Sequence, residues 1–321
     1  MRSKLGQLEI RGNRFQVAPF VMTILLLFCA SLLPSRVQGA PTTNINCPAT
    51  LGPGNYSLNV DLVCAASDRG VPATVLTLDA RAGPIHLDLN GHSITCTSRF
   101  LDTGITVLGS GVHLRGGTVE ECFNGIILQG GGKHHLSGLI IRFNNIVGLG
   151  LRDSQDNHIS NSEISSTLNR GIGLTNSHHN QFKDLLITTN SKFGGISLVG
   201  SDNALISSTV LNNGLGFPAP GSLLSGGVHV EGSRNNVSNN VVVGNSNGVV
   251  LVTGSDNIIE KNEVRNSQHG ISLLVSAILS QVKDNHSVGN AVFDLEDQNP
   301  SCDQNEWKGN TFGTANQPCV E

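Results

Sequence analysis

The sequence predicts an all-β fold, a single-stranded right-handed parallel β-helix solenoid of about nine coils that is capped at both ends. Three observations predict this class. A short motif recurs with a nearly constant period, and two further apolar segments recur in phase with it. The 321 residues also include 38 Gly but are only 4% aromatic and 14% charged. Such a composition has too little charge for disorder and favours regular packing of small residues.

The recurring motif is a Gly followed by an aliphatic residue, any residue and a second aliphatic residue. Successive copies are 21, 23, 23, 24, 32, 21, 22 and 21 residues apart, and the last copy is degenerate. A nearly fixed period of this length indicates a solenoid in which each repeat adds one coil. The copies begin at Gly104, Gly125, Gly148, Gly171, Gly195, Gly227, Gly248, Gly270 and Ala291.

Two more short apolar segments complete each period. The inward positions of the second segment are Leu114, Leu136, Ile159, Phe182, Leu205, Val237, Ile259 and Val282. Three short alternating segments separated by Gly, Asn, Ser and Asp turns are typical of a parallel β-helix. Leucine-rich repeats would need a Leu-rich consensus, and propeller blades are about twice as long.

Repeated turn residues predict that equivalent turns stack on one another. "GSDN" occurs at Gly200 and again at Gly254, two periods later. Gly, Asp and Asn favour the backbone conformations of turns. We expect the recurring asparagines to form a structural ladder of side-chain amides; they are Asn157, Asn180, Asn203, Asn235 and Asn257.

Residues 1–39 have the pattern of a secretory signal peptide. Basic residues precede the apolar run "FVMTILLLFCASLL", and Val37 and Gly39 suit cleavage after Gly39. An uncleaved membrane anchor is the alternative. The remaining chain has 15 Lys and Arg against 23 Asp and Glu, a net charge of −8, with no basic cluster. We therefore expect a secreted or periplasmic protein that is monomeric, leaves the membrane after cleavage and does not bind nucleic acid.

Six cysteines remain after cleavage, an even number that suits an oxidising compartment. We expect residues 40–84 to be an N-terminal cap segment closed by Cys47 and Cys64. Residues 85–295 are the expected β-helix, in which Cys96 and Cys122 fall at nearly the same place on adjacent coils. Residues 296–321 are the expected C-terminal cap, with Cys302 and Cys319 bonded and Trp307 packed inside.

With "LDLNGHSIT" (Leu87 to Thr95) and the coils that follow, the chain resembles the secreted right-handed parallel β-helix repeat proteins of the pectate-lyase-like superfamily. The resemblance covers roughly residues 45–321. It implies the fold, but the superfamily includes polysaccharide lyases, hydrolases, epimerases, tailspikes, adhesins and a protein that helps to mature a copper enzyme. The sequence lacks the catalytic motifs of polygalacturonases, the best-known pectate lyases and uronan epimerases, so whether it is an enzyme stays open.

Four histidines precede inward residues on successive coils: His86, His113, His135 and His158. Strand alternation turns this position outward, so the imidazoles form a column on one face. Such a column could bind copper or zinc. A solvated column that only stacks is the alternative. A divalent metal is the one cofactor that the sequence suggests.

The single long period between Gly195 and Gly227 contains the insertion "GLGFPAPGSLLSG". Insertions on a solenoid commonly shape a binding face, and this one leads to the outward residues His229 and Glu231. Earlier coils contribute Arg152, followed by Asp153, to the same face.

These four residues are the candidate substrate-binding set. Arg152 lies three coils from Glu231, roughly 14 Å, so the set can span several sugars but cannot form one catalytic centre. We expect a protein that binds a polysaccharide along its outer face, with or without catalysis. The alternatives are a divergent polysaccharide lyase, hydrolase or epimerase, and a structural, adhesive or copper- or zinc-handling protein.

Overall fold

The structure, a computed structural model, describes residues 45–64, 73–98, 102–215 and 225–320. The predicted signal peptide, residues 1–39, lies outside this part. Within it, no helix has the length and apolar character needed to cross a membrane. The helical content of the described residues is one 3-10 turn, η1 (Pro300–Cys302).

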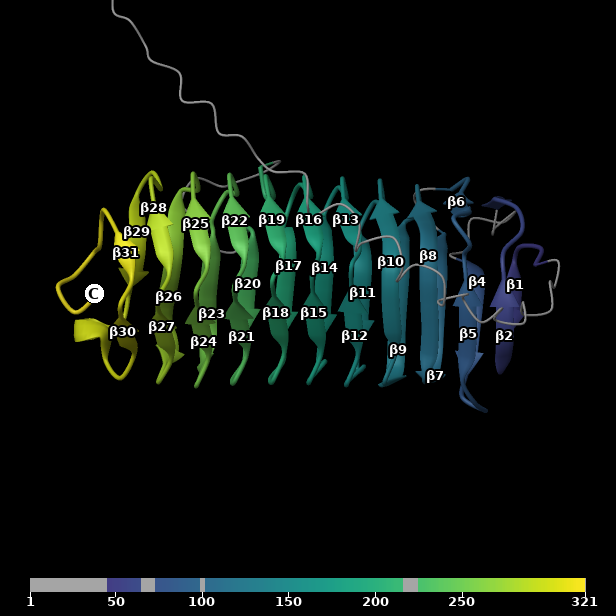
Figure 1. Ribbon diagram of the computed structural model, residues 1–321, viewed down its shortest axis with the longest axis horizontal. Helices are drawn as coiled ribbons and strands as arrows, with labels where there is room; N and C mark the ends of the chain where they lie inside the picture. The colour runs from purple at the N-terminus through teal and green to yellow at the C-terminus, as the bar shows by residue number, and fades with distance from the viewer. Residues whose placement is uncertain (1–44, 65–72, 99–101, 216–224, 321) are drawn as a thin grey trace, which may run out of the picture. The chain divides into compact units, whose positions relative to one another are not determined.

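Eleven parallel strands, one from each coil, form sheet A along one side of the stack (Figure 1). Each inner strand pairs with those of the preceding and following coils, and β1 and β29 end the sheet. Residues at equivalent places therefore form columns along the stack. The strands are β1 (Ala49–Leu51), β4 (Thr74–Ala80), β7 (Thr103–Ser110), β9 (Asn124–Gly132), β11 (Val147–Arg152), β14 (Arg170–Thr175), β17 (Gly194–Val199), β20 (Val228–Glu231), β23 (Val249–Ser255), β26 (His269–Ile278) and β29 (Phe293–Asp297).

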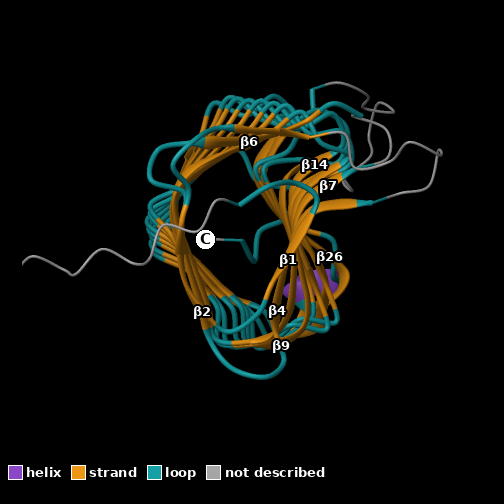
Figure 2. Cartoon of the chain, turned by 90° about the vertical axis from the view of Figure 1, so that its right-hand side faces the viewer, coloured by secondary structure: helices purple, strands orange, loops and turns teal. Residues whose placement is uncertain are grey.

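Two further parallel ladders close each coil, which is three-sided when viewed along the stack (Figure 2). Ladder B consists of β2 (Gly54–Ser57), β5 (Ile85–Asp88), β8 (Val112–Glu120), β10 (His135–Arg142), β12 (His158–Ser160), β15 (Gln181–Lys183), β18 (Ala204–Ile206), β21 (Asn236–Ser238), β24 (Ile258–Glu260), β27 (Gln281–Lys283) and β30 (Glu306–Lys308). Ladder C consists of β3 (Leu62–Cys64), β6 (Ser93–Cys96), the second halves of β8 and β10, β13 (Glu163–Ser165), β16 (Leu186–Thr188), β19 (Thr209–Leu211), β22 (Val241–Val243), β25 (Glu263–Arg265), β28 (His286–Val288) and β31 (Thr311–Phe312).

The stack has about eleven coils, two more than the nine expected. Strands within residues 49–80 and 306–312, which the sequence analysis assigned mainly to the caps, continue the same ladders. The repeat motif was too degenerate there to be recognised, because only the inward side chains must stay apolar. The parallel β-helix itself is confirmed.

The core is a set of aliphatic columns inside the coils. All eight inward positions predicted for the second segment, from Leu114 to Val282, are at most 1% exposed. The matching column of sheet A, with Ile105, Ile126 and Ile172 among its members, is equally buried. Burial of each side chain of this size contributes about 1.5–3 kcal/mol to the free energy of unfolding, so these columns are a main source of the fold's stability.

The two "GSDN" turns adopt the same conformation on the same edge of the stack. Asp202 and Asp256 both have positive φ, 61° and 58°. Gly232 of the intervening coil lies between Gly200 and Gly254, and a Cβ at Gly254 would collide with the carbonyl oxygen of Gly232. Coil spacing at this edge therefore requires glycine, which explains why the motif recurs.

The predicted asparagine ladder is confirmed as structural. Each Oδ1 accepts from the backbone amide of the equivalent residue one coil before, which is His134 for Asn157 and an asparagine for the others; Asn180 Oδ1, for example, also accepts from Asn157 Nδ2 at 2.8 Å. Its members are Asn157, Asn180, Asn203, Asn235 and Asn257, each at most 1% exposed. Similar ladders stack at the other turns, one of them through Asn190, Asn213 and Asn245. Because buried amides must be paired, these ladders hold the turns in register.

All three predicted disulfides are confirmed. The Cα atoms are 5.9 Å apart in Cys47–Cys64, 4.9 Å in Cys96–Cys122 and 6.0 Å in Cys302–Cys319. Trp307 packs into the last coil, 6% exposed, and its Nε1 donates to Asp297 Oδ2 at 2.9 Å. The tryptophan therefore closes the end of the core, as expected.

Candidate functional site

The central outward column of sheet A contains two adjacent residues without side chains. In register order the column includes Ile127, Gly150, Gly173, Ser197 and His229. The two glycines form the floor of a depression of about 300 Å³, with Ile127 packed against Gly150 and Arg170 against Gly173. We call it the arginine groove; Val147, Gly150, Arg152, Arg170, Gly173 and Phe193 line it.

Arg170 is the groove's most unusual side chain. It begins β14, and its Cδ would lie 3.3 Å from a Cβ placed on Gly173, so the side chain extends over the groove floor. Its guanidinium carbon lies 5.5 Å from the ring centre of Phe193. Nε is buried and has no hydrogen-bond partner among the described residues. Burial lowers the pKa of the guanidinium, and the charge of Glu231 partly offsets this effect.

His229 and Glu231, both predicted site residues, form a close pair on β20 of the same sheet. His229 Nε2 lies 2.6 Å from Glu231 Oε1. Although strand alternation turns His229 outward, only 6% of it is exposed. Burial lowers the pKa of His229, the hydrogen bond and charge of Glu231 oppose this, and the charge of Arg170 adds to it. The imidazole is therefore held neutral near pH 7 beside a carboxylate.

The other two predicted site residues, Arg152 and Asp153, lie at different places on the surface. Arg152 is exposed at the end of β11 and lines the arginine groove, in register with Thr175. Asp153 follows with φ of 52° and lines a different depression. The structure thus places Arg152 three coils from Glu231, as expected, and does not bring it to the His229–Glu231 pair.

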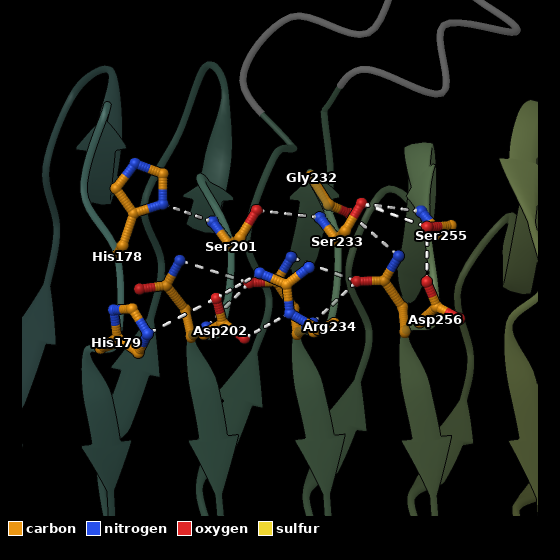
Figure 3. A network of polar contacts seen from close by, with 12 residues as sticks. His178, His179, Ser201, Asp202, Gly232, Ser233, Arg234, Ser255 and Asp256 are labelled. Carbon is orange, nitrogen blue, oxygen red and sulfur yellow. Dashed lines mark hydrogen bonds and ion pairs between the residues drawn. The ribbon is translucent and has the colours of Figure 1, made fainter.

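Asp153 belongs to a second depression of about 400 Å³ at the turn beyond sheet A, the polar hollow, which Ser110, Lys133, Asp153, Asp156, Asn176 and His178 line. Asn176 Nδ2 donates to Asp153 Oδ1 at 2.6 Å. The Ser201 amide donates to His178 Nδ1, and on the next coil the Ser233 amide donates to Ser201 Oγ (Figure 3). These contacts order the rim of the polar hollow.

The four histidines of the predicted column do lie on successive coils of ladder B. Ring centres are 4.5 Å apart for His86 and His113, 4.7 Å for His113 and His135, and 6.0 Å for His135 and His158. The first three rings stack on one another. No group of three or more His, Cys, Asp or Glu in the described part is arranged to hold a metal. Metal binding by this column stays a prediction.

The predicted insertion "GLGFPAPGSLLSG" falls largely on residues 216–224, outside the described part. Sequence reasoning missed Arg170, Phe193 and Ser197. A signal was present: in the eight regular copies of the repeat motif, the third residue is the outward column, and it is Gly only in "GLGL" and "GIGL". Two consecutive outward glycines predict a gap between neighbouring side chains.

The chain thus belongs to the class of parallel β-helix proteins with a groove on one sheet. The family described as "Right handed beta helix region" matches residues 103–264 and 190–312, so the chain belongs to that family. A comparison with curated proteins finds no match.

Solved structures with the same fold include two enzymes that act on alginate. The periplasmic alginate epimerase AlgG is 12% identical with a TM-score of 0.62, over 81% of this chain and 69% of that one. The alginate lyase from Paenibacillus sp. str. FPU-7 is 14% identical with a TM-score of 0.50, over 84% and 99%. At such identities the likeness concerns the fold.

Proposed function

We propose that the protein binds an acidic polysaccharide across sheet A, with a carboxylate of the glycan at Arg170 in the arginine groove. The observation that carries the proposal is the guanidinium of Arg170, which lies over Gly173 with a buried Nε that no described group satisfies. Leaving a buried donor unpaired is costly, and a uronate carboxylate is the ligand that best matches a guanidinium.

The surroundings support a sugar ligand. Phe193 is 42% exposed beside Arg170 and offers an apolar surface. Arg152, the last residue of β11, adds a second positive charge to the same groove. Arg152 pairs with Thr175, five residues beyond Arg170 along the strand, so their Cα atoms are roughly 17 Å apart. The Arg170 side chain extends over Gly173 toward Arg152, so both guanidiniums line one groove and favour an acidic chain. The solved structures of the same fold include an alginate epimerase and an alginate lyase, which agrees with an acidic polysaccharide.

A secreted or periplasmic location is part of the proposal. Three disulfides join the described chain, and such bonds persist in oxidising compartments.

A catalytic role as a lyase or epimerase is the second candidate, and His229 favours it. A buried imidazole kept neutral by its surroundings can accept a proton near pH 7. In this alternative, His229 would remove a proton from a sugar whose carboxylate is held by Arg170. Release of unsaturated products from a uronan, followed by absorbance, would support it.

Binding is tested by titrating oligogalacturonate and oligoalginate into the protein calorimetrically. Arg170→Gln should weaken binding by tenfold or more, because a hydrogen bond to a charged group contributes about 1.5–3 kcal/mol. The control is Arg265→Gln, on ladder C, which removes an exposed arginine paired with Glu263 and should leave the affinity unchanged. Equal affinities for the parent and Arg170→Gln would contradict the proposal.

A further inference from the structure

Three polar atoms without hydrogen-bond partners gather beside the arginine groove. They are Arg170 Nε, Ser197 Oγ and His229 Nδ1, and each is buried. Ser197 is 1% exposed and His229 6%. Native proteins pair nearly all such groups, because an unpaired one costs about 1–3 kcal/mol. A cluster of three, comprising a donor, a hydroxyl and an imidazole nitrogen, therefore points to a ligand that completes their hydrogen bonds.

Register places the hydroxyl next to the imidazole. Ser197 on β17 pairs with His229 on β20 and, on its other side, with Gly173 on β14. Neighbouring strands are roughly 4.8 Å apart, so the side chains of Ser197 and His229 are in reach of each other by rotation about χ1. Gly173 belongs to the floor of the arginine groove, so Ser197 lies on the coil next to the groove without being one of its lining residues.

The hydrogen bond to Glu231 decides which nitrogen of His229 is basic. An ionised carboxylate can only accept, so at 2.6 Å from Glu231 Oε1 the imidazole Nε2 carries the proton. Nδ1 then keeps its lone pair, and this is the nitrogen that lacks a partner. Glu231 thus orients a neutral imidazole whose free nitrogen lies on the neighbouring coil from a serine hydroxyl.

We propose that Ser197 is a nucleophile and His229 its general base, with Glu231 as the positioning residue, and that the site hydrolyses an acyl ester on a sugar held in the arginine groove. A hydroxyl, an imidazole and a carboxylate in series are the arrangement that activates serine on several unrelated folds. The identity of the sugar rests on the proposed function, whereas the serine chemistry can be measured without it.

The reaction balances with water as the only co-reactant. Ser197 Oγ attacks the acyl carbonyl carbon while its proton passes to His229 Nδ1. The carbonyl oxygen becomes an oxyanion, which an N–H of the Arg170 guanidinium that the uronate carboxylate does not use would stabilise. Collapse of this intermediate breaks the bond to the sugar oxygen, which takes the proton from His229. Water, deprotonated by the same nitrogen, then cleaves the acyl-serine and releases the carboxylic acid.

The same column supplies a matched control. Ser272, two coils beyond His229, is also an outward serine of sheet A and is 0% exposed. Its Oγ, however, donates to Glu296 Oε2 at 2.9 Å. Ser272 is therefore a serine of equal burial whose hydroxyl is bound by a carboxylate. The neighbouring His269 contacts that same carboxylate, Nδ1 to Glu296 Oε2 at 2.8 Å, so Ser272 should be unreactive.

The test is labelling by a fluorophosphonate, located by peptide mass spectrometry, together with acetate release from O-acetylated oligogalacturonate. We expect a label at Ser197 and steady acetate release, both reduced at least 100-fold in Ser197→Ala and in His229→Gln. Ser272→Ala should retain the label and the release. Melting temperatures of the three variants establish that they are folded.

Absence of the label on the parent protein, or unchanged acetate release in Ser197→Ala, would overturn the inference. The proposed function is judged separately by oligouronate affinity, which Ser197→Ala should leave within about twofold. If Arg170→Gln abolishes that affinity while no label forms, the binding site stands and the esterase activity fails. If the label forms but Arg170→Gln binds oligouronate normally, the serine chemistry stands and the acidic ligand fails.

Discussion

His134 provides a direct test of how the turn ladders stabilise the fold. It occupies the place that asparagine takes in the following coils, since its own backbone amide donates to Asn157 Oδ1 at 3.0 Å. Its Nδ1 replaces the amide oxygen and accepts from the Val112 amide at 3.1 Å. The side chain is 0% exposed. Protonation of Nδ1 would remove this acceptor inside the turn, so the ladder requires a neutral imidazole.

The pKa of His134 is lowered to about 4, chiefly by burial, against an opposing effect of the Gly109 backbone and with a further decrease from His135 and His113. In the unfolded chain a histidine titrates near 6.5. The unfolded state therefore binds the proton first, and stability falls as the pH drops from about 6.5 toward 4. At pH 4.5 the loss from this one group is about 2.5 kcal/mol, whereas at pH 7.5 it is close to zero.

The substitution His134→Asn restores the ladder residue and removes the titrating group. Urea unfolding at pH 7.5 and 4.5 should show that the parent loses about 2.5 kcal/mol more than the variant between the two pH values. The comparison cancels the other titrating groups, which both proteins share. The control His286→Asn changes an exposed histidine of β28 and should keep the parent's pH dependence. If His134→Asn loses as much stability as the parent, the imidazole is not held neutral by burial, and the reasoning is wrong.

Three further outcomes are expected. Gly173→Val should lower oligouronate affinity about tenfold, because its Cβ would lie 3.3 Å from Arg170 Cδ and displace that side chain from the groove floor; unchanged affinity would show that the ligand does not cross the groove floor. The double change Cys96→Ser/Cys122→Ser, which opens a link of 26 residues, should cost about 3.5 kcal/mol in urea unfolding, and a loss below about 1 kcal/mol would contradict this. Saturating Zn²⁺ or Cu²⁺ should raise the melting temperature at pH 7.5, and His113→Gln/His135→Gln should abolish the rise; an equal rise in that variant would place the metal elsewhere.

Much of the fold followed from the sequence because a β-helix repeats one local pattern. Inward residues such as Phe182 and Leu205 recur every coil, and the turn asparagines recur with them, so register could be read along the chain. The disulfide Cys96–Cys122 followed from the same phase. The pattern failed at the ends, where strands such as β1 and β31 keep the pairing but lose the motif.

By itself the sequence determined the coil, the inward columns, the asparagine ladder and the positions of His229 and Glu231 on one outward face. Tertiary structure alone decided what those outward residues contact. Arg170 and Phe193 are 23 residues apart and meet only because adjacent coils stack, and Ser197 is brought beside His229 across a 32-residue period. Outward positions also differ in burial for reasons that periodicity does not contain, so that His229 is covered while Arg152 is exposed. A one-dimensional repeat specifies which way a side chain points, whereas its partners and solvation depend on neighbours one coil away.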